Sequence, residues 1–464
     1  MKTRIEVDSL GEKRLPLEVY YGIQTLRATE NFPVSGIKAP AVFAHAYVMI
    51  KKAAATANMH VGWLNKEIGS AIIKACDEIL DGKLMDQFVI DVFQAGAGTS
   101  FNMNVNEVLA NRALQILGSE KGDYETVSPN DHVNMAQSSN DTFPTALHIA
   151  TLTLLGPLIS ELEKLSYSFE KLAEKYADVI KSGRTHLQDA LPVTLGQELN
   201  AYAAALKNAS MQLQAGSKRL EELALGGTAV GTGVNAHPKY KRIVIEELAK
   251  MTGLNLKPAK NPFEALQSQN AIAAVSGALK ELALELIRIA NDLRLLSSGP
   301  TTGLAEISLP PVQPGSSIMP GKVNPVMAEC LNMIGFQIIG NDLALSLAVQ
   351  AGQLELNVMT PVIMHNILES IQLLTNYLPV FTKKCVEGIT VDKKRCASYV
   401  DKNPSLAVFL SSRIGYLEAS KIAKQSLAEK KSVKEIAVKK GILKPKQATQ
   451  IFKPDSMLGE KRRK

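Results

Sequence analysis

The sequence predicts an all-α protein whose centre is a bundle of unusually long helices. Between about residues 145 and 176, apolar side chains recur at steps of three and four residues, the spacing of one face of an α-helix. Similar patterns cover residues 196–222, 268–297, 326–350 and 357–385. Each stretch is longer than the average globular helix of about 11 or 12 residues. Because their apolar faces are broad, a bundle shared between subunits is favoured over a monomeric bundle.

Length and composition indicate a globular chain with several parts. At 464 residues, with 46% hydrophobic and 21% charged residues, it exceeds the usual size of a single compact core. We expect an N-terminal domain of helices and loops over residues 1–140, a central long-helix domain over 141–393, and a small C-terminal helical domain over 394–464.

The N-terminal part mixes one clear helical pattern with polar segments. The stretch "VMIKKAAATANM" from Val48 predicts a helix. In contrast, "FQAGAGTSFNMNVNEVLANRA" and "SPNDHVNMAQSSNDTFPT" are crowded with Gly, Ser, Thr and Asn, and they predict loops.

The positive net charge of +7 is concentrated at the C-terminus. Residues 430–464 hold 12 Lys or Arg against 3 Asp or Glu, and the chain ends in "EKRRK". A run of this kind is usually a solvated end. Phe452 is the single aromatic residue within it, so a base-stacking surface has little support. We therefore expect no nucleic-acid partner.

The cysteines and the apolar runs predict a cytoplasmic protein. The four cysteines form no CxxC pair and have no histidine at metal-ligand spacing, so we expect reduced thiols, no metal site and no cofactor. Charges occur throughout the first 16 residues, and no uninterrupted apolar run reaches the roughly 20 residues of a membrane span. A membrane partner is therefore not expected.

Four polar segments interrupt the helical patterns: "GAGTSFNMN" at Gly96, "QSSND" at Gln137, "SGRTHLQDA" at Ser182 and "GSSIMPGKVNP" at Gly315. We expect loops there, where binding and catalytic residues concentrate. Any one segment alone is more typical of helix caps and turns, but together their short hydrogen-bonding side chains suit a small anion with several oxygens. The candidate residues are Thr99, Ser138, Ser139, Asn140, Thr185, His186, Ser316, Lys322 and Asn324.

Several common catalytic motifs are missing from the sequence. It contains no HExxH, P-loop or GxGxxG, which removes the usual support for zinc proteolysis, nucleotide hydrolysis and dinucleotide binding. His186 stands in a polar segment and His148 on a helical pattern, so His186 is the better functional candidate. A Ser-His-Asp arrangement cannot be established from spacing, because its members would come from distant segments.

The segment "GSSIMPGKVNP" resembles the signature of the aspartase and fumarase superfamily of lyases. Further segments are similar to motifs of that superfamily: "SSND", "GRTHLQDALPVTLGQE", "GGTAVGTGVNAHP" and "GQLELNVM". The resemblance therefore extends over nearly the whole chain. It implies an all-helical subunit of three domains, a long central bundle shared in a homotetramer, and active sites that each draw on three chains. It also implies a small dicarboxylate substrate and a reversible anti-elimination that commonly yields fumarate.

The same resemblance implies roles for single residues. Ser316 occupies the position of the base that removes the carbon-bound proton, in a mobile loop over residues 315–325, with Ser317 in a supporting place. Because serine is a poor base, the glycine-rich backbone and Lys322 are expected to stabilise its alkoxide. The family positions that hold the substrate are matched by Thr99, Ser138, Ser139 and Asn140. Thr185 and His186 match the positions beside the leaving group, and Lys322 and Asn324 match those that bind the other carboxylate. Glu329 matches the acid that pairs with the histidine.

Secondary motifs distinguish between the branches of the superfamily. The segments "YYGIQTLRATENF", "GAGTS", "AGQLELNVM" and "NDLRLLSSGP" resemble aspartases. Ser139, where aspartases tend to carry threonine, and "KNPSLA" near Lys402 resemble fumarases, and Thr301 stands where many members carry arginine. The balance predicts an aspartate ammonia-lyase. A class II fumarate hydratase is the alternative, and a non-catalytic scaffold protein of the same fold is a remote one.

Overall fold

The computed structural model describes residues 2–458, so the end of the predicted basic tail, residues 459–464, lies outside the described residues. The chain divides into two compact units. Unit 1 comprises Met1–Ser160, Met211–Ala283 and Ile334–Thr375, and unit 2 comprises Glu161–Ser210, Leu284–Met333 and Asn376–Lys464. The predicted division into three domains, with boundaries near residues 140 and 393, stays a prediction.

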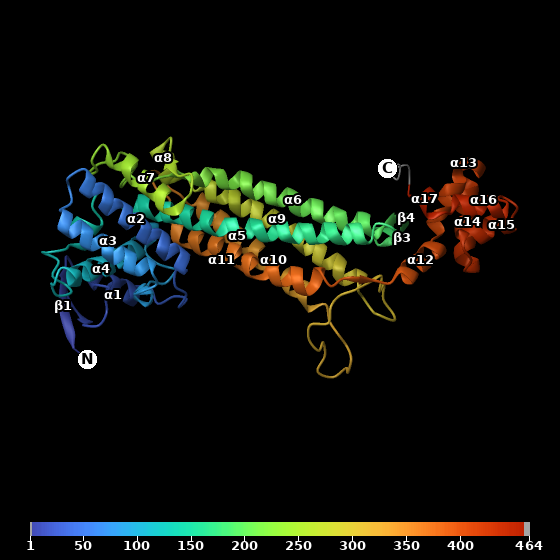
Figure 1. Ribbon diagram of the computed structural model, residues 1–464, viewed down its shortest axis with the longest axis horizontal. Coiled ribbons are helices and arrows are strands. Elements are labelled where there is room, and N and C mark those ends of the chain that lie inside the picture. The colour runs from blue at the N-terminus through green and yellow to red at the C-terminus, as the bar shows by residue number, and fades with distance from the viewer. Residues whose placement is uncertain (1, 459–464) are drawn as a thin grey trace. The chain divides into compact units, whose positions relative to one another are not determined.

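Five long helices confirm the main prediction from the sequence (Figure 1). They are α5 (Ser139–Lys175), α6 (Leu195–Ser217), α9 (Asn270–Leu296), α10 (Val326–Gln350) and α11 (Thr360–Phe381). Their bounds agree with the predicted spans to within a few residues. The three- and four-residue periodicity of apolar side chains was therefore a sufficient signal for these helices.

In unit 1, polar side chains join neighbouring long helices. Asp342 of α10 accepts hydrogen bonds from Ser276 and Lys280 of α9, both at 2.7 Å. Asn341 of α10 donates to Glu369 of α11 at 2.8 Å. Asn341 and Asp342 are both buried, so these bonds lie in a low-dielectric environment that strengthens them.

In unit 2, side-chain hydrogen bonds also join neighbouring long helices. Ser166 of α5 donates to the carbonyl of Ala203 of α6 at 3.0 Å, and Tyr202 of α6 donates to Asp292 of α9 at 3.0 Å. Asn332 of α10 donates to Asn291 of α9 at 2.6 Å. Each unit thus contains a segment of the helical bundle.

The rest of unit 1 consists mainly of shorter helices. The helix predicted from Val48 is confirmed as part of α2 (Ala41–His60). The other elements are the antiparallel hairpin β1 (Thr3–Asp8) and β2 (Gly11–Pro16), the helices α1 (Ile23–Asn31), α3 (Lys66–Leu80), α4 (Thr99–Ile116), α7 (Tyr240–Thr252) and α8 (Pro262–Gln267), the π-helix η3 (Pro129–Val133), the 3₁₀ helices η1 (Met85–Gln87), η2 (Gly96–Gly98) and η4 (Lys218–Glu221), and the short strands β5 (Glu222–Leu223) and β6 (Lys257–Pro258).

The prediction of a loop after Gly98 is wrong, because these residues form the buried helix α4. Its asparagines do not compete with the helix for their own backbone but bond to neighbouring segments. Asn104 accepts from the Val89 N–H and donates to the Gln87 carbonyl, both at 3.0 Å. Asn111 donates to the Tyr20 carbonyl at 2.8 Å. Tertiary hydrogen bonds thus override the loop preference of asparagine. In the second predicted loop, residues 139–145 likewise begin α5.

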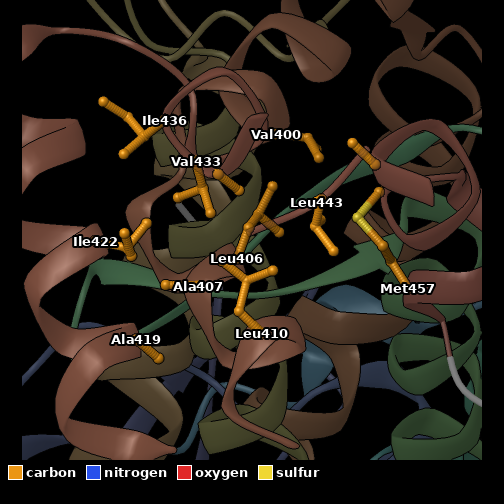
Figure 2. Close-up of a cluster of buried hydrophobic side chains, with 12 residues drawn as sticks. Val400, Leu406, Ala407, Leu410, Ala419, Ile422, Val433, Ile436, Leu443 and Met457 are labelled. Atoms are coloured by element: carbon orange, nitrogen blue, oxygen red, sulfur yellow. The ribbon is translucent and has the colours of Figure 1, made fainter. Parts of the chain in front are cut away.

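The remaining part of unit 2 contains two small antiparallel sheets and a group of C-terminal helices. The sheets are the hairpin β3 (Ile180–Thr185) and β4 (Gln188–Thr194), and the pair β7 (Ile307–Ser308) and β8 (Thr390–Val391). The helices are η5 (Thr382–Val386), α12 (Lys393–Lys402), η6 (Pro404–Leu410), α13 (Ser411–Ile414), α14 (Tyr416–Glu429), α15 (Val433–Lys439), α16 (Pro445–Ile451) and α17 (Pro454–Met457). Figure 2 shows the apolar core of the C-terminal helices, with Leu406, Leu410, Ile422, Val433 and Ile436 turned toward one another.

Two helices of the described chain, α5 and α10, are long and apolar enough to cross a membrane by length and composition alone. In α5, 61% of the apolar window is buried inside the protein, as in the core helix of a globular fold. In α10 the buried share is 39%, so most of this apolar window is at least partly exposed in the described part of the chain.

Two glycines with positive φ bound α4 and provide a matched test of its packing. Gly98 (φ 69°) precedes the helix and Gly118 (φ 84°) follows it. A Cβ on Gly98 would lie 1.8 Å from Phe143 Cδ2, whereas a Cβ on Gly118 would meet nothing within 4 Å. Gly98→Ala should therefore lower the free energy of unfolding by roughly 3 kcal/mol, against roughly 1 kcal/mol for Gly118→Ala, which carries only the left-handed backbone penalty. Urea denaturation followed by circular dichroism measures both, and equal losses would contradict the predicted clash.

Candidate active site

Four candidate residues of unit 1 gather at the N-termini of two helices. Thr99 is the first residue of α4, and Ser139 and Asn140 lie in the first turn of α5, directly after Ser138. The Thr99 Oγ1 and Ser139 Oγ atoms are 3.0 Å apart. The prediction of loops is therefore corrected: these side chains stand at helix starts, where free N–H groups and the helix dipole favour an anion.

Asp141, which was not predicted from the sequence, holds this group in place through hydrogen bonds to the backbone. Its Oδ1 accepts from the Ser138 N–H at 3.0 Å, and its Oδ2 accepts from the N–H groups of Gly226 (3.0 Å) and Thr228 (2.9 Å). Burial raises the pKa of Asp141 to about 7, although these three N–H groups favour its ionised form. Asn140 donates to the Ala229 carbonyl at 2.8 Å, so the 226–229 segment is held by two consecutive residues of α5.

A cavity of about 580 Å³ opens beside Thr99 within unit 1. Arg27, Ser128 and Asn130 contribute to its wall, together with the predicted Thr99. Arg27 is held by Asp8 through two hydrogen bonds of 2.8 and 2.9 Å. The cavity gives a ligand room next to Thr99.

Thr185 and His186 lie at the tip of the β3–β4 hairpin of unit 2, rather than in an irregular loop. Thr185 pairs with Gln188, so His186 and Leu187 form a two-residue turn, and both have positive φ (53° and 60°). Hairpin turns of this kind favour Asn and Gly, because side chains larger than these are strained there. Strained residues concentrate at functional sites. The exposed His186 is therefore held at this position at a cost in stability.

Buried ion pairs hold the stem of this hairpin. The Glu306 carboxylate is fully buried and accepts from Arg184 at 3.0 and 3.1 Å, while Lys181 lies 2.9 Å away. Lys181 also pairs with Glu198 at 2.6 Å. Asn403 donates to the Ser182 hydroxyl at 2.6 Å. Glu306 was not a candidate from the sequence, because its partners lie more than a hundred residues away in the chain.

The 315–325 segment of unit 2 has no regular secondary structure and is tied mainly to itself. Gly315 N–H donates to the Lys322 carbonyl at 2.8 Å, and Asn324 donates to the Gly315 carbonyl at 2.6 Å. The Ser316 Oγ accepts from the N–H groups of Ile318 (3.2 Å) and Met319 (2.9 Å). A pocket of about 470 Å³ in this segment is lined by residues that include Ser316 and Lys322. Ser317 and Lys322 are exposed.

The described residues do not bring all the candidates of unit 2 together. Among residues 2–458, no hydrogen bond joins the Thr185–His186 turn to the 315–325 segment, and none joins Glu329, in the first turn of α10, to His186. Within the same range, no group of three or more His, Cys, Asp and Glu side chains is placed to hold a metal ion.

Comparison with known proteins shows the same family over most of the chain. A family model described as Lyase matches residues 11–340, and one described as Fumarase C C-terminus matches residues 406–459. The chain is 49% identical over 454 residues to an aspartate ammonia-lyase of Bacillus subtilis (strain 168), covering 98% of this chain and 96% of that protein.

Two solved structures have closely similar folds. A Brucella melitensis protein described as "fumarate lyase:delta crystallin", bound to cobalt, is 48% identical with a TM-score of 0.94 over 98% of this chain and 99% of its own. A class II fumarase from Schistosoma mansoni is 39% identical with a TM-score of 0.94 over the same shares of the two chains.

The buried pairing at Glu306 generates a stability prediction. Glu306→Gln keeps the shape of the side chain but removes the charge that Lys181 and Arg184 share, so the free energy of unfolding should fall by roughly 3 kcal/mol. Glu246→Gln is the control, because Glu246 pairs with Arg242 on the exposed face of α7 and its loss should cost under about 0.5 kcal/mol. Denaturant titration measures both variants. Similar small effects at the two positions would show that the ion pairs of Glu306 contribute little to the free energy of unfolding.

Proposed function

The chain belongs to the aspartase and fumarase family of lyases, and from this premise we propose that it is an aspartate ammonia-lyase. Such an enzyme converts L-aspartate reversibly to fumarate and ammonia by breaking a carbon–nitrogen bond. The observation that carries the proposal is the 49% identity to an aspartate ammonia-lyase over 98% of the chain, against 39% to the fumarase. The substrate is then a small dicarboxylate.

The elimination requires stabilisation of a dianionic carboxylate. A base removes a proton from the carbon next to one carboxylate, and the charge spreads onto that carboxylate as an aci form. The carbon–nitrogen bond then breaks, its electron pair leaves with the amine, and the double bond forms. Preorganised hydrogen-bond donors at the position of developing charge contribute about 3 to 4 kcal/mol each.

The donors for this carboxylate are assigned to the group in unit 1. Thr99, Ser138 and Ser139 supply hydroxyls, and Asn140 supplies an amide. Their placement at the starts of α4 and α5 supports the assignment, because helix N-termini favour negative charge. The 3.0 Å separation of the Thr99 and Ser139 oxygens also supports this assignment, because both hydroxyls can donate to the same ligand.

Ser316 is assigned as the base. A serine acts as a base only when its alkoxide is stabilised, and its Oγ already accepts two backbone N–H groups, from Ile318 and Met319. Lys322 adds a cation to the same segment, and Ser317 has a supporting place. Movement of the 315–325 loop over the substrate would exclude water and strengthen these interactions.

The remaining candidates are assigned to the rest of the substrate. Lys322 and Asn324 bind the second carboxylate, and Thr185 and His186 lie beside the departing amine. Glu329 pairs with His186, in this proposal across a subunit boundary, because no hydrogen bond joins them within one described chain.

A homotetramer is part of the proposal, and helix α10 supports it. Met333, Phe336, Leu343 and Leu347 are all more than half exposed, and with Gly340 they follow steps of three and four residues along one face. This is the spacing of a helix-packing seam. A Cβ on Gly340 would meet nothing within 4 Å, so a second helix could approach closely there. We propose that other copies of the chain cover this seam and complete the active sites.

A cytoplasmic location is also proposed. The four cysteines are free, and Cys76, Cys385 and Cys396 are buried. Free thiols are typical of a reducing compartment.

Incubation of the purified protein with L-aspartate tests the function. Fumarate should accumulate, as measured by its ultraviolet absorbance, and L-malate should give no signal. Ser139, where aspartases tend to carry threonine, favours the fumarase alternative, so L-malate is the necessary second substrate. Absorbance that rises with L-malate alone would identify a fumarate hydratase instead.

Ser316→Ala tests the base on the same assay. Turnover should fall by about three orders of magnitude or more, because no other group at that position can accept the proton, while the oligomeric state stays as in the wild type. Ser317→Ala is the matched control, with an expected change of less than about tenfold. Retention of turnover in Ser316→Ala would exclude this serine as the base.

Phe336→Glu tests the seam on α10. A charge there should break the assembly into smaller species and abolish turnover, because charged groups are costly in the centre of an apolar interface. Lys250→Glu, on the exposed face of α7, introduces the same side chain and should leave the assembly intact. Light scattering coupled to size-exclusion chromatography measures the mass. An intact tetramer in Phe336→Glu would show that the seam lies elsewhere.

A further inference from the structure

Lys51 of α2 is a fully buried cation with no role in the chemistry proposed above. Its residue exposure is 0%. Its Nζ donates three hydrogen bonds, all to side-chain amide oxygens: those of Asn102 (2.8 Å), Asn134 (3.0 Å) and Gln137 (2.9 Å). An ammonium group has three N–H donors, so all of them are used. Because burial of a charge is costly, a complete set of partners indicates an organised site.

The three acceptors belong to the segments that carry the substrate-binding candidates. Asn102 lies three residues after Thr99 in α4, and Gln137 directly precedes Ser138. Asn134 connects the two, because its Oδ1 also accepts from Asn102 at 3.2 Å and its Nδ2 donates to the Gln137 carbonyl at 3.2 Å. Lys51 therefore joins the start of α4 to the segment that leads into α5.

The ammonium group also determines which way each amide faces. With its oxygen turned to Lys51, Gln137 directs its Nε2 to the carbonyls of Val133 and Met135, both at 3.0 Å. An uncharged apolar side chain at position 51 would leave the amide oxygens without their donor, and the amides would lose this orientation.

Asp141 of α5 and Tyr47, which lies one turn earlier on α2, partly offset the cost of burying the Lys51 charge. Burial lowers the pKa of Lys51 to about 7, while the negative charge of Asp141 acts in the opposite direction. The Tyr47 ring lies 5.5 Å from the Nζ, and the Tyr47 hydroxyl is 2.8 Å from Thr142 Oγ1 of α5. Lys51 thus sits among groups that themselves contact the start of α5.

We propose that Lys51 is a positioning residue for the lyase reaction, an inference that rests on the proposed function. It does not touch the substrate. It holds α4 and the 134–137 segment together, so that Thr99, Ser138 and Ser139 address the substrate carboxylate in one fixed arrangement.

Three variants of the full-length oligomer test this role. Lys51→Met removes the charge and all three hydrogen bonds at similar volume. Asn102→Leu is milder, because it cuts only the link to α4 and leaves Lys51 with two acceptors. Lys52→Met is the matched control: Lys52 is the next residue of α2, and it pairs with Asp77 at a partly exposed position. KM and kcat for L-aspartate are measured, together with the dissociation constant of succinate, a dicarboxylate without a leaving group.

A positioning role requires weaker substrate binding in enzyme that is still folded. KM and the succinate constant should rise about tenfold or more in Lys51→Met and about threefold in Asn102→Leu, and should stay within about twofold in Lys52→Met. A lower kcat with unchanged KM and succinate affinity would overturn the proposal, because loss of folded enzyme alone produces that pattern. If Lys51→Met does not fold, Asn102→Leu decides by the same criterion.

Failure of the positioning role can be distinguished from failure of the ammonia-lyase assignment. If the wild type turns over L-malate and not L-aspartate, the ammonia-lyase assignment fails. The KM comparison is then made with L-malate, and succinate binding still reports on Lys51.

Discussion

Small neutral donors bind a dianion well only if the surrounding structure holds them in place. A threonine or serine hydroxyl rotates freely, so its contribution depends on the backbone that presents it. Three fully buried ionisable residues adjoin the candidate groups: Asp141 holds the Ser138 backbone, Lys51 holds the Gln137 amide, and Glu306 holds Arg184, next to Thr185. Because an unpaired buried charge is costly, each of these contacts is strongly enforced. Stability and placement of the site therefore have one physical origin.

The long helices could be predicted from the sequence because their signal is local. Apolar residues at steps of three and four indicate a helix whatever lies around it, and α10 was predicted with its observed bounds. The α4 helix could not be predicted in this way. Its Asn104 and Asn111 are typical of loops until their partners, Val89 and Tyr20, are known. The prediction failed where tertiary contacts, rather than neighbours in sequence, decided the conformation.

The candidate site shows the same division. Ser316, Lys322 and Asn324 were found because they lie in one contiguous, recognisable segment. Lys51 and Glu306 were missed because a buried charge has no sequence signature of its own, and its partners are distant in the chain. The assignment of roles across subunits stays a prediction, because the completing groups would come from other copies of the chain.

The two backbone donors to Ser316 come from residues two and three positions further along the same segment. If this segment moves, the Ser316 oxygen and its two anion-stabilising backbone amides would move together as one rigid unit. The acidity of the hydroxyl would then be set largely before substrate arrives, and closing would serve to align it with the C–H bond. Substitutions at the ends of such a unit would then change the rate of loop closure, and with it the turnover rate, without changing the reactivity of Ser316.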